Sequence, residues 1–173
     1  KAEPEALHMI AMKADGALRD ALSVFDQIVT FSENNITYQD VINNLHILDY
    51  DYFFKFTEFA DKEDIPSCLL LFNEIVENGF DSHNFINGLS SHYRNLLVCK
   101  NPKSADLLEV PDGIKDKYLK QANEINVNII MRALNALSKA DVSYKSAKNQ
   151  RLLVEVCLME LCSLKQEQEK KKP

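Results

Sequence analysis

Arg19 is the residue best placed to bind a ligand, because it lies near the start of a predicted helix that runs from an N-cap at Asp15 to about Phe31. The amides of a first helical turn carry positive partial charge, which favours acidic side chains there. A cation in this turn makes sense if an anion completes the site, since a helix N-terminus and a guanidinium together bind phosphate well. The alternative is an ordinary surface helix, in which Arg19 pairs with Asp15, Asp20 or another nearby carboxylate.

The same helix has a well-defined apolar face. Its apolar residues recur at helical spacing and form one stripe: Leu18, Ala21, Leu22, Phe25, Ile28 and Val29. Arg19, Ser23 and Asp26 lie three and four residues apart on another side. We therefore expect the stripe to be buried and Arg19 to lie on the polar side.

The amino-acid sequence of this helix resembles that of a known family. Residues 14–23, ADGALRDALS, followed by Asp26 and Gln27, closely resemble the sensor-2 helix in the lid of bacterial clamp-loader ATPases, the gamma/tau subunits of DNA polymerase III. Residues 5–13 resemble the preceding lid helix, and residues 107–111 and 118–122 resemble the family's collar domain. The resemblance is dense over residues 5–47 and looser beyond. It implies that Arg19 reaches the terminal phosphate of ATP in the full-length protein.

The sequence has no motif for nucleotide hydrolysis, metal binding or nucleophilic catalysis. The sequence contains no G-x-x-x-x-G-K-[ST] loop, no strand followed by an Asp-Glu pair for magnesium, and no Ser–His–Asp or Cys–His arrangement. We therefore predict no catalytic residue and no metal ligand. The resemblance implies that the full-length protein is a subunit of the DNA polymerase holoenzyme with ATPase activity, and that it binds ATP and magnesium. We expect neither ATP nor magnesium to bind this fragment alone.

The cysteines and histidines favour structural roles. Cys68, Cys99, Cys157 and Cys162 form no C-x-x-C pair, so we interpret them as reduced core residues of an intracellular, cytoplasmic protein. His83 and His92 lie nine residues apart without further ligands, and we interpret them as surface or hydrogen-bonded histidines.

Charge and composition exclude several classes of protein. The net charge is −6, and residues 1–50 carry three basic and eight acidic side chains. This balance argues against these residues as the main nucleic-acid-binding surface, because phosphate binding needs clustered basic side chains. No apolar run of 18 residues predicts a membrane span, and no signal-peptide pattern opens the chain. The first residue is Lys1 and not Met, so we expect a fragment of a longer protein.

The predicted fold is all-α in two parts. Residues 1–48 are expected to form a three-helix lid, whose third helix begins at a capping box of Thr37 and Asp40. Residues 49–165 are expected to form the helical collar, and residues 166–173 a charged tail or linker. Asp64, Asp81 and Asn126 are predicted helix caps, and a last helix is expected over about 147–165.

Two predicted helices of residues 49–165 have apolar faces that we expect to be buried against other surfaces. Phe53, Phe56 and Ala60 share one helical face, which favours a core or subunit interface over base stacking because no basic residues are interleaved. The next helix has a predicted core face of five residues: Leu69, Leu70, Phe72, Ile75 and Val76. Residues 49–165 are therefore expected to carry the main association surface.

The resemblance implies a part of the replicative clamp loader, which uses ATP to load a sliding clamp onto primed DNA. The implied partners are other gamma/tau copies, the delta and delta-prime subunits, the sliding clamp and primer–template DNA, with no membrane. Two alternatives stay open from the residues alone. One is a non-enzymatic helical adaptor or scaffold, and the other is the lid region of another replication or recombination ATPase.

Overall fold

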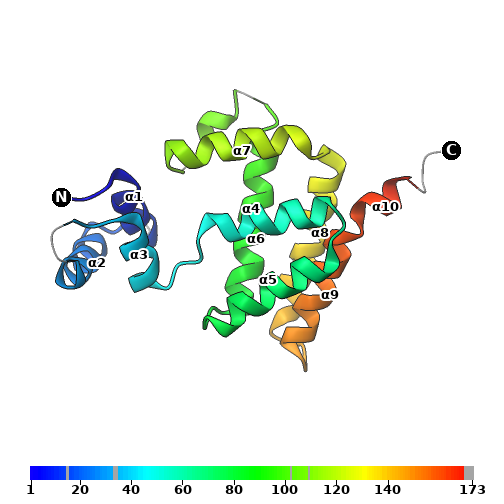
Figure 1. Ribbon diagram of the computed structural model, residues 1–173, viewed down its shortest axis with the longest axis horizontal. Coiled ribbons are helices and arrows are strands. Elements are labelled where there is room, and N and C mark those ends of the chain that lie inside the picture. The colour runs from blue at the N-terminus through cyan, green and yellow to red at the C-terminus, as the bar shows by residue number, and fades with distance from the viewer. Residues whose placement is uncertain (15, 33–34, 102, 109, 170–173) are drawn as a thin grey trace. The chain divides into compact units, whose positions relative to one another are not determined.

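The computed structural model of the chain describes residues 1–14, 16–32, 35–101, 103–108 and 110–169. Within these ranges the regular elements are ten α-helices and one short 3₁₀ helix, which confirms the predicted all-α class. The chain divides into two compact units, Lys1–Asp49 with Glu109–Gly113 and Tyr50–Leu108 with Ile114–Pro173 (Figure 1). None of the described helices is long and apolar enough to cross a bilayer.

The first unit is built from three short helices, α1 (Pro4–Lys13), α2 (Leu18–Phe31) and α3 (Tyr38–Leu45). Helix α1 packs against both α2 and α3. A parallel bridge between Ala2 and Ile36 ties the start of the chain to the segment before α3, with Ile36 N donating to Lys1 O at 2.8 Å. The core of the unit is small: Ala6, Met9, Ile10, Ala14, Ile28, Ile36, Val41 and Ile42.

The predicted capping box starts α3. The Asp40 amide donates to Thr37 Oγ1 at 3.2 Å, and the Thr37 amide donates to Asp40 Oδ2 at 3.0 Å. The Thr37 hydroxyl also donates to Asp40 Oδ2, and these bonds lower the pKa of the Asp40 carboxyl. Helix α2 begins at Leu18 after Ala17, which supplies no side-chain cap. The predicted cap Asp15 lies outside the described residues.

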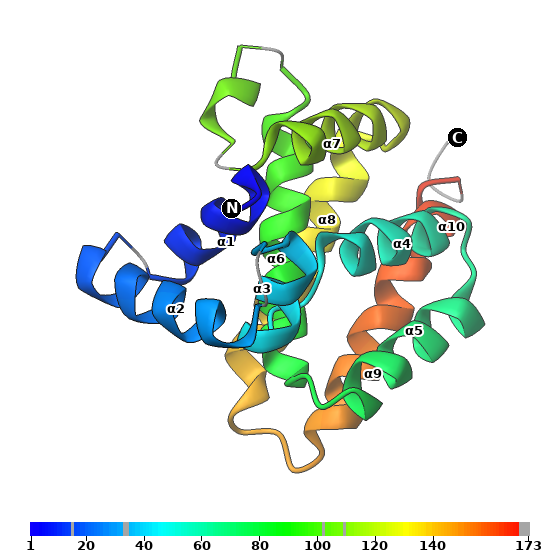
Figure 2. The same ribbon diagram turned by 60° about the vertical axis from the view of Figure 1, so that its left-hand side comes forward.

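The second unit holds the remaining helices: α4 (Tyr50–Asp61), α5 (Ile65–Glu77), α6 (Ser82–Val98), η1 (Ala105–Leu107), α7 (Asp112–Glu124, whose first residues belong to the first unit), α8 (Val127–Tyr144), α9 (Gln150–Cys162) and α10 (Leu164–Glu169). Helices α6 and α8 pack along each other at its centre, and α9 packs against α5 and α8 (Figure 2). The predicted caps Asp64, Asp81 and Asn126 each accept a backbone N–H bond at 2.8–3.1 Å. Asn149 caps α9, which therefore begins later than predicted.

An aromatic cluster centred on Phe85 fills the core of the second unit. The Phe85 ring lies 5.7 Å from the Phe72 ring and 5.9 Å from the rings of Phe53 and Phe56, measured between centroids. Gly88 allows this packing, because a Cβ there would lie 2.2 Å from Phe53 Cζ. The predicted aromatic face of α4 is thus confirmed as core.

Two predicted features of the second unit are wrong in part. Leu70 was expected in the core of α5 but is 70% exposed, while Leu71 is buried in its place. Three consecutive leucines leave the phase of the helix ambiguous, and the buried Phe72 and Ile75 decide it.

The predicted tail also differs, because residues 164–169 continue as helix α10. Lys165 Nζ lies 2.7 Å from Asp61 Oδ1, and Gln166 Nε2 donates to Glu63 Oε2 at 2.9 Å. Residues 170–173 lie outside the described part of the chain.

Candidate functional site: Arg19 and the exposed strip of α2

Arg19 lies in the first turn of α2 and is exposed. Among the residues that the structure describes, no carboxylate forms an ion pair with it, although Asp20 is its neighbour. Among the described residues, no side chain caps the first turn of α2, which follows Ala17. Within the described part of the chain, the guanidinium and the first turn of α2 therefore have donors without a side-chain acceptor, an arrangement that attracts anions.

The apolar stripe of α2 is only half covered. Ile28 is fully buried and Ala21 and Phe25 are half-buried, whereas Leu18, Leu22 and Val29 are 74%, 56% and 46% exposed. At the rotation of an α-helix, these three exposed side chains lie on a strip next to the buried face. This set, Leu18, Leu22 and Val29, is called the α2 strip below.

Arg19 borders the α2 strip, because it precedes Leu22 by three residues. An exposed apolar strip is stabilised when another surface covers it, and a guanidinium at its edge then becomes partly desolvated. Arg19 thus lies beside apolar side chains that its own unit leaves exposed. The sequence predicted Arg19 on the polar side of α2 but not the uncovered strip beside it.

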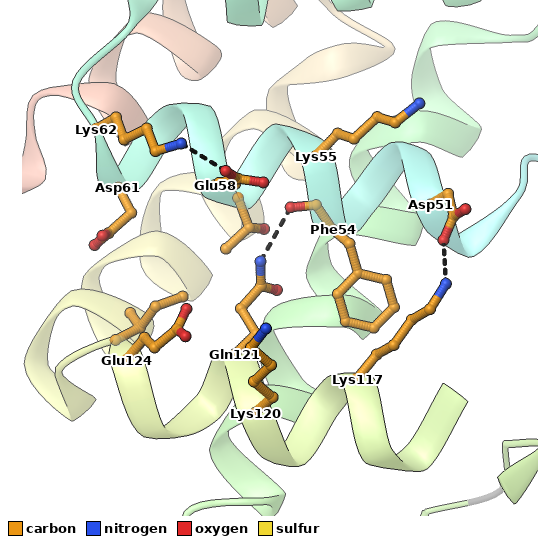
Figure 3. A pocket seen from close by; sticks show the side chains of 12 residues that line it. Asp51, Phe54, Lys55, Glu58, Asp61, Lys62, Lys117, Lys120, Gln121 and Glu124 are labelled. Carbon is orange, nitrogen blue, oxygen red and sulfur yellow. Dashed lines mark hydrogen bonds and ion pairs between the residues drawn. The ribbon is translucent and has the colours of Figure 1, made fainter. Parts of the chain in front are cut away.

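A second candidate is a groove of about 500 Å³ between α4 and α7 in the second unit (Figure 3). Lys62 Nζ lies 2.5 Å from Glu58 Oε1, and Lys117 Nζ lies 2.7 Å from Asp51 Oδ1. Phe54 forms an apolar wall between these pairs. The groove contains lysines and carboxylates in equal number, so no net charge selects a ligand.

His92 anchors α7 beneath this groove. Its Nδ1 lies 3.1 Å from Tyr118 Oη and its Nε2 lies 2.9 Å from Gln121 Oε1, while Gln121 Nε2 donates to Phe54 O at 3.0 Å. Burial lowers the pKa of His92 to about 3, so the ring is neutral. Its Nε2–H donates to the Gln121 amide oxygen, which leaves Nδ1 to accept a hydrogen bond from the Tyr118 hydroxyl. This confirms the interpretation of His92 as a hydrogen-bonded histidine.

The other polar candidates are structural as well. His83 Nε2 lies 2.6 Å from Asp141 Oδ1. Cys99 and Cys157 are buried, and burial raises the pKa of Cys157 to about 12. Cys68 and Cys162 are also buried and their sulfur atoms lie 3.1 Å apart, a pairing that nothing in the sequence indicated. No cluster of metal-ligating side chains occurs among the described residues.

Two family models match consecutive parts of this chain. Residues 1–34 match the ATPase lid domain of the DNA polymerase III clamp loader subunit, and residues 36–173 match domain III of the DNA polymerase III subunits gamma and tau. The chain belongs to the gamma/tau family.

Curated gamma/tau relatives match between about half and nine-tenths of the chain. The tau subunit of Bacillus subtilis is 22% identical over 92% of this chain and 28% of its own length. The gamma/tau subunit of Mycoplasma genitalium is 29% identical over 88% of this chain and 28% of its own length. The tau subunit of Escherichia coli is 33% identical over 46% of this chain and 12% of its own length. The chain thus spans less than a third of these gamma/tau relatives.

A solved structure shares the fold. The DNA clamp loader delta protein of Bacillus subtilis aligns over 94% of this chain and 51% of its own, with a TM-score of 0.59 and 18% identity. The lid family model ends at residue 34, while α3 (Tyr38–Leu45) packs with α1 and α2 in the first unit. Arg19 and the α2 strip lie inside the residues that match the gamma/tau lid.

Proposed function

We propose that this chain is the lid and collar part of a clamp-loader gamma/tau subunit, which in its full-length form uses ATP to load a sliding clamp onto primed DNA in the cytoplasm. The observation that carries the proposal is the contiguous match to the lid and to domain III of this family. The proposed partners are further gamma/tau copies, the delta and delta-prime subunits, the sliding clamp and primer–template DNA.

Within this function, residues 1–48 act as the lid over a nucleotide site on another part of the protein. The α2 strip supplies apolar surface to be covered by that part, and Arg19 at its rim reaches the terminal phosphate of ATP. A guanidinium fork matches phosphate oxygens, and the first turn of α2 adds positive partial charge. Magnesium, the phosphate-binding loop and the hydrolytic groups belong to other parts of the full-length protein.

Residues 49–165 act as the collar through which subunits assemble, and residues 166–173 lead out of it. The second unit supports this role because its interior is filled while several apolar side chains stay on its outside. A stable contact between subunits buries on the order of 1,600 Å² of surface.

The test is Arg19→Ala in the full-length protein, with Arg94→Ala as the control. Arg94 is exposed in the second unit and bonds only to the adjacent Asn95 among described groups. We expect Arg19→Ala to lower ATP-dependent clamp loading by about 10- to 100-fold, as loss of a charged hydrogen bond implies, with unchanged thermal unfolding. Clamp loading equal to wild type in Arg19→Ala contradicts the assignment of Arg19.

A further inference from the structure

Two buried cysteines from distant parts of the chain contact each other in the second unit. Cys68 lies in the first turn of α5, and Cys162 is the last residue of α9, 94 residues further along the chain. Their side chains are 0% and 1% exposed, and their sulfur atoms lie 3.1 Å apart. Because a disulfide bond is about 2 Å long, the two sulfur atoms need to approach by only about 1 Å to form one.

The other two cysteines have no such partner. Cys99 and Cys157 are buried as well, but among the described residues no hydrogen bond joins either of them to another cysteine. Cys157 lies on the same helix as Cys162, and burial alone makes it a small apolar side chain of the core. Cys157 is therefore matched to Cys162 in burial and helix, and it differs in lacking a neighbouring thiol.

The contact makes the two thiols chemically unequal. Hydrogen bonding with Cys68 lowers the pKa of the Cys162 thiol, whereas the same bond and burial raise the pKa of the Cys68 thiol. Cys162 therefore loses its proton before Cys68 does, and it is the better nucleophile because the thiolate reacts and the thiol does not. Cys68 already touches the sulfur atom of Cys162, as the resolving thiol of a disulfide-forming pair must.

We infer that Cys68 and Cys162 form a redox-responsive pair, which a peroxide converts into a disulfide and a dithiol converts back into two thiols. The Cys162 thiolate attacks one oxygen of hydrogen peroxide, which breaks the O–O bond, forms a sulfenic acid and releases hydroxide. The Cys68 thiol then attacks the sulfenic sulfur, which forms the S–S bond and releases water. The hydroxide takes up the proton that Cys162 lost, so two thiols and one peroxide give one disulfide and two water molecules.

The disulfide would join the two elements next to which α10 is held. Through Lys165 and Gln166, α10 contacts Asp61 and Glu63 at the junction of α4 and α5. The end of α9 leads into α10, and the first turn of α5 follows this junction. Helices α5 and α9 pack against each other (Figures 1 and 2), so the bond adds a covalent link to an existing contact. A link between residues so far apart in the chain strongly restricts the unfolded state, and the oxidised pair therefore stabilises this region.

The experiment oxidises the full-length protein with hydrogen peroxide after complete reduction. Mass spectrometry of its peptides should show the peptide of Cys68 joined to that of Cys162 with loss of two hydrogen atoms, and dithiothreitol should separate them. Met12 and Met131 are nearly half exposed, so their sulfoxides show when the peroxide has acted. Amide hydrogen exchange in α10 and in the first turn of α5 should become at least about tenfold slower on oxidation, with α1, α2 and α3 unchanged.

Two variants assign these effects to the pair. Cys157→Ala is the matched control, and it should form the link at the wild-type rate. Cys162→Ala should form no link, and peroxide should leave amide exchange in its α10 unchanged. The wild-type protein carries the main measurement, so the test does not depend on the folding of either variant.

Three results overturn the inference. One is sulfoxide at Met12 and Met131 without a link between Cys68 and Cys162. The second is accumulation of a sulfinic acid at Cys162 in place of the link, which would show that Cys68 does not resolve the sulfenic acid. The third is a link that leaves amide exchange in α10 and α5 unchanged. None of these measurements uses ATP hydrolysis or clamp loading, so a failure of the proposed function is seen separately.

Discussion

The two units of the chain differ in how completely they bury their own apolar residues. Of the largest side chains that are under 2% exposed, Ile28 is the one in the described part of the first unit, while the others, including Phe56, Phe72 and Tyr118, belong to the second. In the first unit, α2 leaves Leu18 and Leu22 largely exposed. The second unit therefore has the larger core, whereas the small core of the first leaves part of the apolar stripe of α2 uncovered within its own unit.

The difference between the two units suits them to different functions. A filled interior such as that of the second unit holds a rigid shape, which suits a part that sets the geometry of an assembly. An amphipathic helix with an uncovered apolar strip and a cation at its edge suits a part that binds another surface and contacts an anion held by that surface. The predictions below test this difference between the units, beginning with the largest expected effect.

The core of the second unit should respond strongly to a cavity. Phe72→Ala removes a fully buried ring that packs on Phe85, and we expect a loss of about 3–5 kcal/mol in the free energy of unfolding. Leu70→Ala, two residues away but exposed, should change it by less than about 0.5 kcal/mol. Urea unfolding of the two variants measures both values, and a similar loss in both would contradict the described phase of α5.

The buried His92 should make the second unit sensitive to acid. Its pKa is lowered to about 3 from 6.5, so between these values the unfolded chain binds more protons than the folded one. The free energy of unfolding should therefore fall as the pH falls through this window, by up to about 1.4 kcal/mol per pH unit from this group. His92→Gln should reduce the slope in urea unfolding between pH 7 and pH 4.5.

The control for this pH dependence is His46→Asn, at an exposed helix end where Asn tolerates the left-handed backbone. The slope of this variant is the reference against which the slope of His92→Gln is compared. Equal slopes for wild type and His92→Gln would show that His92 is not buried as a neutral group.

The capping box of the first unit should give the smallest effect. Thr37→Ala removes the acceptor for the Asp40 amide, and we expect a loss of about 0.5–2 kcal/mol, as for other N-caps. Amide hydrogen exchange should then be faster in α3 and unchanged in α6 and α8 of the second unit. Thr30→Ala is the control, since the Thr30 hydroxyl donates to Asp26 O within its own helix. Uniformly faster exchange in both units would contradict a local effect of the cap.

Local features of this fold could be predicted from the sequence, and non-local ones could not. The caps Thr37, Asp64 and Asp81 were predictable because each acts within three residues of itself. The partners of His92 lie 26 and 29 residues away, and no spacing rule connects them.

The state of α2 shows the same limit. Helical periodicity identified its apolar face, but periodicity does not tell which part of a face is covered by the same unit and which part by another surface. The contact of Arg19 with a phosphate stays a prediction for the same reason, because the anion would be bound by a part of the protein outside this chain.

The central claim is that the α2 strip is covered in the full-length protein while ATP is bound. The most direct test is the rate of thiol labelling at Leu22→Cys, compared between residues 1–173 and the full-length protein with a non-hydrolysable ATP analogue. The four native cysteines are buried and react slowly, and Gln27→Cys, exposed on another side of α2, is the control. The account predicts labelling of Leu22→Cys at least about tenfold slower in the full-length protein, with Gln27→Cys unchanged. Equal labelling rates at Leu22→Cys in the two proteins would contradict it.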